Sequence, residues 1–319
     1  MAVGDAELTF REGTAADLAV TFDLSERTMH DSAVRQGVID PRHELTDDQI
    51  RSDWIRHKAL LEFIAAQPEG RYVIAENGEG PVGYARVVRF GAMEELTELM
   101  VCPRHQGGGI GRSLLEQCWP GDPTPELGRV VVAAGAPSDL SLYTEFGVMP
   151  VSGHWHMRQR TDHYLARRAH EAGEGDIDVH ALSPDNAVKA WERLEPSAIA
   201  HRRSALHEFF CRDRYCLAVL DPQTGEAQSL CWVSSDGEIG PAVSARAGGL
   251  VPVVVAALDR VAKTIEPEYL SVFTTTISWW LLRRLRTLGF TVFWPGWVMC
   301  SEPLPGLDRY TPTRPPHLL

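Results

Sequence analysis

The sequence predicts an α/β protein of the α+β type, built from two similar domains in which helices flank a mixed, mostly antiparallel sheet. Two observations lead to this fold class. The chain has 319 residues, which is long for one domain and comfortable for two, and its 44% hydrophobic and 23% charged residues are typical of a soluble globular protein. In addition, strand-like and helix-like segments follow one another in the same order in both halves.

The first half opens with a short strand in LTFRE, followed by a helix that begins at a capping-box-like Thr14 to Asp17 and extends to about Met29. A second helix is predicted around 47–66, and two strands form a hairpin across the Gly-rich turn of residues 71–90. The remaining predicted elements are a strand at 95–102, a glycine loop, a helix at 109–119, a strand at 129–134, a helix at 138–146 and a strand at 148–158.

The second half repeats this order. Its predicted elements are a strand at 177–182, a helix opened by Ser183-Pro184, a hairpin around DPQTGE, a strand at 238–244, a helix at 250–264, a strand at 269–276, a helix at 278–287 and a strand at 291–299. Val101 and Val243, like Gly147 and Gly289, are 142 positions apart. We therefore predict a duplicated domain, with copies at 1–160 and 176–302, a charged helical linker at 161–175 and a proline-rich tail at 303–319.

Several classes of protein are disfavoured by the sequence. The N-terminal MAVGDAELTF has no basic segment followed by an apolar one, and no run of about 18 apolar residues occurs, so we expect a cytoplasmic protein that does not enter membranes. Six scattered cysteines form no C-x-x-C pair, and His154 and His156 are expected to pack, so no metal cofactor is expected. The net charge of −12 argues against nucleic acid and mildly favours a cationic partner.

The glycine loop, QGGGIGR at residues 106–112, lies between an apolar strand and the start of an apolar helix. Successive backbone N–H groups in such a turn face one concavity, and the helix dipole adds positive charge there, so the favoured ligand is a phosphate. The dinucleotide pattern G-x-G-x-x-G fails because Arg112 occupies the last glycine position, and the P-loop pattern lacks Gly-Lys-Ser/Thr. The remaining pattern is Gln106-x-x-Gly109-x-Gly111, directly after the strand. A tight turn without a ligand is the less favoured alternative.

At these residues the sequence resembles the GNAT superfamily of acyl-CoA-dependent N-acyltransferases, whose pyrophosphate loop has this pattern in this setting. The order of elements extends the resemblance over 1–160 and, more weakly, over 176–302. It implies two GNAT-like domains with splayed sheets, in which the strand before the loop is bulged and the gap beside it receives the pantetheine arm of acetyl-CoA. The cofactor contacts implied are the backbone at Met100 and Val101 and the loop residues Gln106, Gly107, Gly108, Gly109, Ile110, Gly111 and Arg112, the arginine being alternatively only solvated.

The resemblance also implies candidates for proton transfer. Acyl transfer from a thioester needs a neutral amine, a donor for the oxyanion and a proton for the leaving thiolate. Tyr143, four residues before Gly147, occupies the position of the tyrosine that many of these enzymes use as general acid; packing is its alternative role. Glu95 and Glu98 are the candidate bases, with Glu95 in the better alignment and Glu98 the fallback, and either can instead be a solvent-facing carboxylate. The asparagines common after the fifth strand of this family are replaced by Ala133 and Ala136.

The second copy lacks the equivalents of these groups. At the same offset, Gly109 and Gly111 correspond to Val251 and Val253, Tyr143 to Leu285, and Glu95 and Glu98 to Gly237 and Gly240. We therefore predict a degenerate domain that supports the first, shapes its acceptor pocket or makes an oligomer contact, such as that of a homodimer. The aromatic stretch from Phe293 to Trp297 is expected to pack in the core rather than to form a ligand cage.

The leading functional hypothesis is an N-acetyltransferase that moves an acetyl group from acetyl-CoA to a primary amine of a small molecule by direct attack. A non-catalytic acyl-CoA-binding or scaffold protein, transfer of a longer acyl group and transfer to a protein amine remain alternatives. An acidic segment would suit a cationic acceptor, although a solvated helix face explains it better. Its residues are Glu44, Asp47, Asp48 and Asp53.

Overall fold

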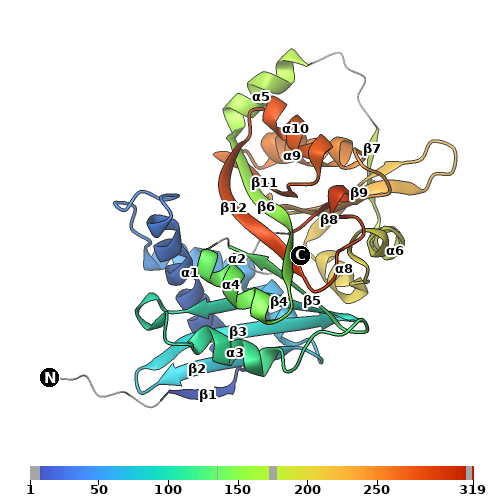
Figure 1. Ribbon diagram of the computed structural model, residues 1–319. Coiled ribbons are helices and arrows are strands. Elements are labelled where there is room, and N and C mark those ends of the chain that lie inside the picture. The colour runs from blue at the N-terminus through green and yellow to red at the C-terminus, as the bar shows by residue number, and fades with distance from the viewer. Residues whose placement is uncertain (1–7, 135, 172–177, 314–317) are drawn as a thin grey trace.

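The computed structural model describes residues 8–134, 136–171, 178–313 and 318–319. The predicted fold class is confirmed, because helices flank two sheets of mixed and mostly antiparallel strands (Figure 1). The first half contains β1 (Thr9–Glu12), η1 (Ala15–Asp17), α1 (Leu18–Arg35), α2 (Asp47–Ala65), β2 (Arg71–Asn77), β3 (Gly80–Phe90), β4 (Met93–Val101), η2 (Pro103–His105), α3 (Ile110–Cys118), β5 (Gly128–Ala133), α4 (Pro137–Glu145), β6 (Met149–Arg160) and α5 (Thr161–His170).

The second half follows the same plan, with three α-helices instead of two between its first two strands. Its elements are β7 (Val179–Leu182), α6 (Pro184–Leu194), α7 (Pro196–Ile199), α8 (Ser204–Phe210), β8 (Arg214–Leu220), β9 (Ala227–Ser234), β10 (Ile239–Ser244), α9 (Leu250–Thr264), β11 (Tyr269–Thr275), α10 (Trp279–Thr287), β12 (Thr291–Cys300), η3 (Leu307–Arg309) and β13 (Tyr310–Thr311).

Local sequence signals explain where the first helices begin. The amide of Thr14 donates to Asp17 at 2.8 Å, so the predicted capping box is present and precedes a 3-10 turn that leads into α1. The helix α1 runs six residues beyond the expected Met29 to Arg35, before Gly37 leaves the helical region with φ of 71°. The longer helix reaches the glycine loop, where Arg35 contacts Gln106.

The strand β4 has the bulge and the splay that the family resemblance implied. Against β3, Arg86 lies opposite Glu98 but Val87 lies opposite Leu96, so Thr97 is an extra residue. The parallel ladder with β5 extends only from Met93 to Leu96. Beyond Leu96 the two strands diverge, and an opening forms between them.

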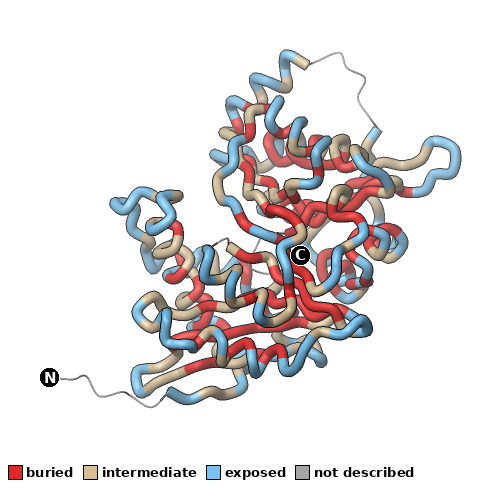
Figure 2. The backbone as a smooth tube through the Cα atoms, in the orientation of Figure 1, coloured by how far each residue is buried: buried red, intermediate tan, exposed pale blue. Residues whose placement is uncertain are grey.

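The two halves exchange their last strands. The larger sheet has the order β1-β2-β3-β4-β5-β12-β6-β11, so β12 of the second half pairs with β5 of the first, and β6 pairs with β11 (Figure 1). One buried cluster correspondingly combines Val88 and Val130 with Trp191 and Val298. Buried residues are continuous from the central strands into the junction of the halves (Figure 2). The predicted boundary between residues 160 and 176 therefore separates the two halves in the sequence. It does not separate two sheets, because the large sheet contains strands from both halves.

The tail predicted at 303–319 is part of the fold where it is described. Within it, β13 pairs antiparallel with β10, with Val243 opposite Tyr310. The hydroxyl of Thr275 at the end of β11 donates to the carbonyl of Leu307 at 2.7 Å. In the second half, β10 and β11 correspond to β4 and β5. The segment that contains β13 therefore lies in the second half where the first half has its opening.

Close passage of β12 alongside β5 requires a glycine. A Cβ added at Gly296 would lie 2.6 Å from the carbonyl oxygen of Ala133 and 3.3 Å from that of His154. We predict that Gly296→Ala lowers the free energy of unfolding by about 1–3 kcal/mol, because backbone atoms cannot move aside as a flexible side chain can. Urea denaturation measures the loss. Gly78→Ala is the matched control, since a Cβ there meets nothing within 4 Å; equal stability of the two variants would contradict the prediction.

Candidate active site

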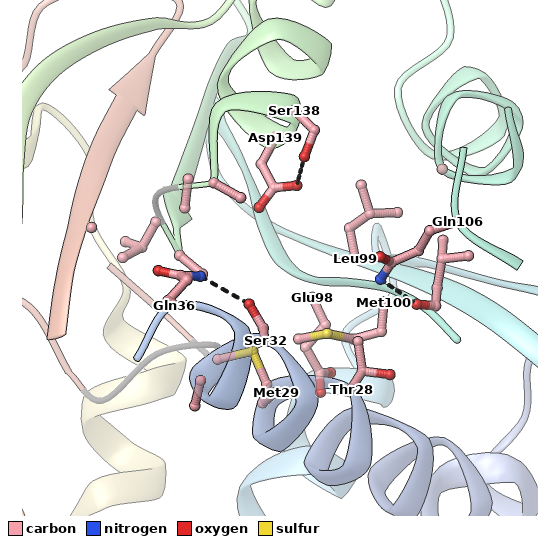
Figure 3. Close-up of a pocket in the computed structure, with 18 of the residues that line it drawn as sticks. Thr28, Met29, Ser32, Gln36, Glu98, Leu99, Met100, Gln106, Ser138 and Asp139 are labelled. Atoms are coloured by element: carbon pink, nitrogen blue, oxygen red, sulfur yellow. Dashed lines mark hydrogen bonds between the residues drawn. The ribbon is translucent and has the colours of Figure 1, made fainter. Parts of the chain in front are cut away.

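A cavity of about 820 Å³ opens at the splay between β4 and β5 (Figure 3). Its walls come from the C-terminal half of α1, from β4 beyond Leu96, from the glycine loop, from β5 and from α4. The second half contributes β11 and β12 to the same cavity. Most of the candidate residues from the sequence are thus brought to one place.

The glycine loop forms one end of the cavity. Gly107 and Gly109 have φ angles of 81° and 85°, a region that favours glycine, and a Cβ at either would meet no atom within 4 Å. Gly109 is the N-cap of α3, and the side-chain amide of Gln106 donates to the carbonyl of Val101 at 2.9 Å (Figure 3). The glutamine therefore ties the loop to the end of β4, with the first turn of the helix facing open space.

Of the nine residues expected to contact the cofactor, eight line the cavity and Gly108 does not. The guanidinium of Arg112, for which a phosphate contact is predicted, forms an ion pair with Glu145 on α4. Arg35 at the end of α1 is a second cation on the cavity wall, 3.3 Å from the side-chain oxygen of Gln106 and ion-paired with Asp31. Sequence analysis missed Arg35, because only the fold brings the end of α1 to the loop.

Tyr143 lies on α4 and lines the cavity with 6% of its surface exposed. Burial, with a smaller contribution from nearby Asp139, raises the pKa of the Tyr143 phenol above its usual value. Burial likewise raises the pKa of Asp139, which accepts a hydrogen bond from Ser138 at 3.3 Å (Figure 3). The phenol is therefore protonated at neutral pH and can act as a proton donor.

Glu98 lines the cavity from β4, on the wall opposite Asp139 (Figure 3). Its carboxylate accepts a hydrogen bond from the Tyr84 hydroxyl at 2.8 Å and forms a buried ion pair with Arg86. These partners satisfy a charge that would otherwise be costly to bury. Glu98 is thus an oriented carboxylate at the point where the strands diverge.

The two candidate bases lie in different places: Glu98 lines the cavity, whereas Glu95, the preferred candidate from the sequence, does not. The extra residue Thr97 places both carboxylates on the same face of β4, but Glu95 lies where the second half covers the sheet. Glu95 and Glu98 are equally buried, at 2% and 3% exposed, but Glu95 does not line the large cavity. Its oxygens accept hydrogen bonds from His201 at 3.0 Å, from Arg203 at 3.4 Å and from the amide of Leu319 at 3.1 Å.

The electrostatics of Glu95 fit a structural role. Burial by itself would raise the pKa of Glu95, but the Arg203 guanidinium and the hydrogen bonds from His201 and Leu319 turn the net shift downward. Arg203 is also paired with Glu195 at 2.8 Å, and the Glu195 carboxylate lies 3.0 Å from His207. These groups form a charged network inside the molecule that joins the two halves.

The second half supplies an aromatic wall, which corrects the expectation that Phe293 and Trp294 only pack in the core. Both line the cavity, whereas Trp297 on the same strand does not. Phe273 of β11 and the histidines His154 and His156 of β6 complete this wall. The aromatic stretch was visible in the sequence, but its position depends on the exchange of strands.

The acidic residues of the 44–53 segment do not line the cavity. Asp47 pairs with Arg27 at 2.6 Å and Asp48 with Arg51 at 2.9 Å, while Asp53 pairs with Arg56. Ion pairs on an exposed surface fit the solvated helix face that was the preferred explanation.

Two further properties concern the described part of the chain. Its histidines, cysteines and carboxylates form no group of three or more that could hold a metal ion. Among its helices, none combines the length and apolar character that crossing a membrane requires.

Comparison with known proteins finds a family model that matches part of the chain. Residues 68–147 match the model of the acetyltransferase (GNAT) domain. No curated protein sequence matches the chain.

Solved structures share the fold along most of the chain. A putative acetyltransferase from Pyrococcus horikoshii is 15% identical, with 95% of this chain and 92% of that one covered and a TM-score of 0.67. A tandem GNAT protein from the clavulanic acid biosynthesis pathway is 17% identical, with coverages of 93% and 99% and a TM-score of 0.59. A GCN5-related N-acetyltransferase from Sphaerobacter thermophilus is 16% identical, with coverages of 94% and 97% and a TM-score of 0.53. Residues 68–147 are therefore similar to the acetyltransferase (GNAT) domain, and the fold of the chain resembles that of the tandem GNAT protein and the other acetyltransferase structures.

Proposed function

We propose that this protein transfers an acetyl group from acetyl-CoA to a primary amine of a small molecule. The observation that carries the proposal is that the glycine loop, the phenol of Tyr143 and the carboxylate of Glu98 line one cavity at the splay. The loop is suited to the pyrophosphate. Beyond Leu96, the edge of β4 that faces the opening has no pairing with β5, so its backbone groups are available to the pantetheine amides.

The two proton-transfer groups approach the splay from opposite faces of the sheet. Tyr143 packs in a cluster with Leu96, Val131 and residues of α3. Glu98 shares its face with Tyr84 and Met100, which pack against Leu18 of α1. The splay is thus a passage in which an acyl donor held on the α3 side meets an acceptor from the α1 side.

The proposed reaction is a direct attack. The amine nitrogen forms a bond to the thioester carbon, and collapse of the tetrahedral adduct breaks the carbon–sulfur bond. Tyr143 donates its proton to the leaving thiolate, while Glu98 receives the amine proton directly or through a water molecule. The products are the N-acetyl amide and free coenzyme A, and the proton returns from Glu98 to Tyr143 through solvent.

A non-catalytic acyl-CoA-binding or scaffold protein would use the same loop, and turnover distinguishes it, because only an enzyme releases thiol when amines are supplied. Transfer of a longer acyl group, or transfer to a protein amine, is tested by changing one substrate at a time in the same assay. Acetyl transfer to a small amine is preferred because the donor and acceptor sides share one cavity of about 820 Å³, a size suited to small molecules.

Cofactor binding should depend on Gly109. We predict that Gly109→Val weakens acetyl-CoA binding by at least about tenfold, because a branched side chain enters the phosphate approach and disturbs amides that bond a charged group. Calorimetry should also give one site per chain, since β13 fills the second splay.

The control for Gly109→Val is Gly121→Val. Gly121 has a φ of 71° and open space at its Cβ but lies outside the cavity. Both variants should lose similar stability from the strained backbone. Unchanged acetyl-CoA affinity in a folded Gly109→Val protein would remove the loop from the proposed site.

Removal of one hydroxyl tests the general acid. Tyr143→Phe keeps the ring and its packing, so the melting temperature and acetyl-CoA affinity should change little. We expect kcat to fall by about 10- to 1,000-fold, the value of one general-acid contact. Steady-state thiol release gives kcat, and full turnover in a destabilised phenylalanine variant would assign Tyr143 to packing.

The two carboxylates of β4 should respond differently to the same change. Glu98→Gln should lower kcat/KM at neutral pH by about 10- to 100-fold. The difference in kcat/KM between the variant and the wild type should shrink as the pH rises toward the amine pKa of about 10.4, because more of the acceptor amine is then already neutral. Glu95→Gln should reduce stability but leave turnover per folded molecule unchanged. Thermal melts establish the folded fraction, and a Glu98→Gln deficit that does not vary with pH would refute a base at this position.

A further inference from the structure

Five aromatic side chains on neighbouring strands form one surface of the cavity wall, here called the aromatic lobe: His154, His156, Phe273, Phe293 and Trp294. They come from three neighbouring strands, β11, β6 and β12. Two of these strands belong to the second half, so the lobe exists only because the last strands are exchanged.

The strand register places the lobe on the α1 side of the sheet, with Glu98. On β4, Glu98 and Glu95 share a face, and Glu95 lies beside Val130 of β5. Val130 is opposite Cys300 of β12, and alternation along β12 brings Val298 and Gly296 to that same face.

The register continues from β12 to the lobe itself. Gly296 lies opposite His154, and two residues further along β6, His156 lies opposite both Trp294 and Phe273. These side chains therefore line the acceptor side of the splay rather than the side of α3 and α4.

The rings of the lobe are held in place before any ligand binds. Phe273 stacks on His154 with centroids 5.2 Å apart and planes 8° apart, and on His156 at 4.5 Å and 22°. Phe293, the extra residue of a bulge in β12, meets the ring of His156 edge-on at 5.2 Å and 89°. The indole of Trp294 donates to the carbonyl of Ala134 at 3.0 Å.

Charge is distributed unevenly around the cavity. No carboxylate or ammonium belongs to the lobe, and the nearest guanidinium, that of Arg158, lies 3.5 Å from the centre of the Phe293 ring without lining the cavity. Burial lowers the pKa of His154 to about 3, so this imidazole is neutral. Its Nε2 has no hydrogen-bond partner among the described residues. The carboxylates of Glu98 and Asp139 line other parts of the wall. An amine with one charged and one aromatic end matches this division.

We propose that the acceptor is a primary amine bearing an aromatic ring, with the ring on the aromatic lobe and the amino group directed to Glu98. The proposal rests on the acyltransferase function proposed above and names its substrate class. A ring can meet the lobe edge to face or offset-stacked, whereas a saturated group of equal size gains only contact area. The second half then has a function in substrate selection although its own splay is filled.

The experiment compares 2-phenylethylamine with 2-cyclohexylethylamine, which have the same chain length and similar volume. With acetyl-CoA as donor, thiol release should give a kcat/KM about 3- to 10-fold higher for the phenyl compound, as expected for one aromatic pair. Trp294→Leu and Phe293→Leu, made separately in case one fails to fold, should each bring the ratio toward one. Trp297→Leu is the matched control: it lies on the same strand outside the cavity, is 39% exposed, and should preserve the ratio.

Calorimetric titration of both amines onto the protein with coenzyme A separates this inference from the proposed function. Tighter binding of the phenyl amine that is lost in Trp294→Leu supports the aromatic lobe, even if no amine is acetylated and the proposed reaction fails. Equal kcat/KM and equal affinity for the two amines overturn the inference and leave acetyl transfer intact. A preference for benzoyl-CoA over acetyl-CoA, without any preference among amines, also overturns it, because the lobe would then hold the acyl group.

Discussion

The exchange of the last strands is the constraint on which the rest of the structure depends. Because β12 pairs with β5 and β6 pairs with β11, neither half can complete its sheet without the other. The exchange also fixes backbone distances, since Gly296 passes so close to Ala133 that no side chain fits between them. The core at the junction and the aromatic wall of the cavity both follow from this one pairing.

Buried charged groups also determine how the two halves dock at this junction. Two glutamates three residues apart on β4 have different partners: Glu98 is held by Tyr84 and Arg86 within the first half, and Glu95 by His201 and Arg203 from the second. A buried carboxylate must be paired, and an unpaired one would cost several kcal/mol. Correct docking of the second half is therefore required to satisfy Glu95, while Glu98 remains at the open splay.

The second half has the same order of strands as the first, but β13 occupies the position of the opening between its strands. Valines replace the glycines of the loop, and β13 adds a strand to β10 at the place where the first half has a cavity. An empty splay would expose backbone groups and apolar side chains to solvent. A strand from the same chain forms hydrogen bonds with the backbone groups and covers the apolar side chains. This explains how a domain without a glycine loop stays stable and still contributes one wall to its neighbour.

The sequence by itself determined the order of elements, the repeat and the glycine loop, because these depend on local patterns: alternation in strands, caps of helices, and the backbone freedom that Gly107 and Gly109 require. The family resemblance also implied a bulge in the strand before the loop, which the structure has at Thr97, and the predicted general acid Tyr143 lines the cavity. Only the tertiary structure decided which carboxylate faces the cavity, which cation reaches the loop, and that Phe293 and Trp294 line the site. The physical reason is that strand pairing between distant segments leaves no local signature: β12 has the same alternation whether it pairs within its own half or crosses to β5.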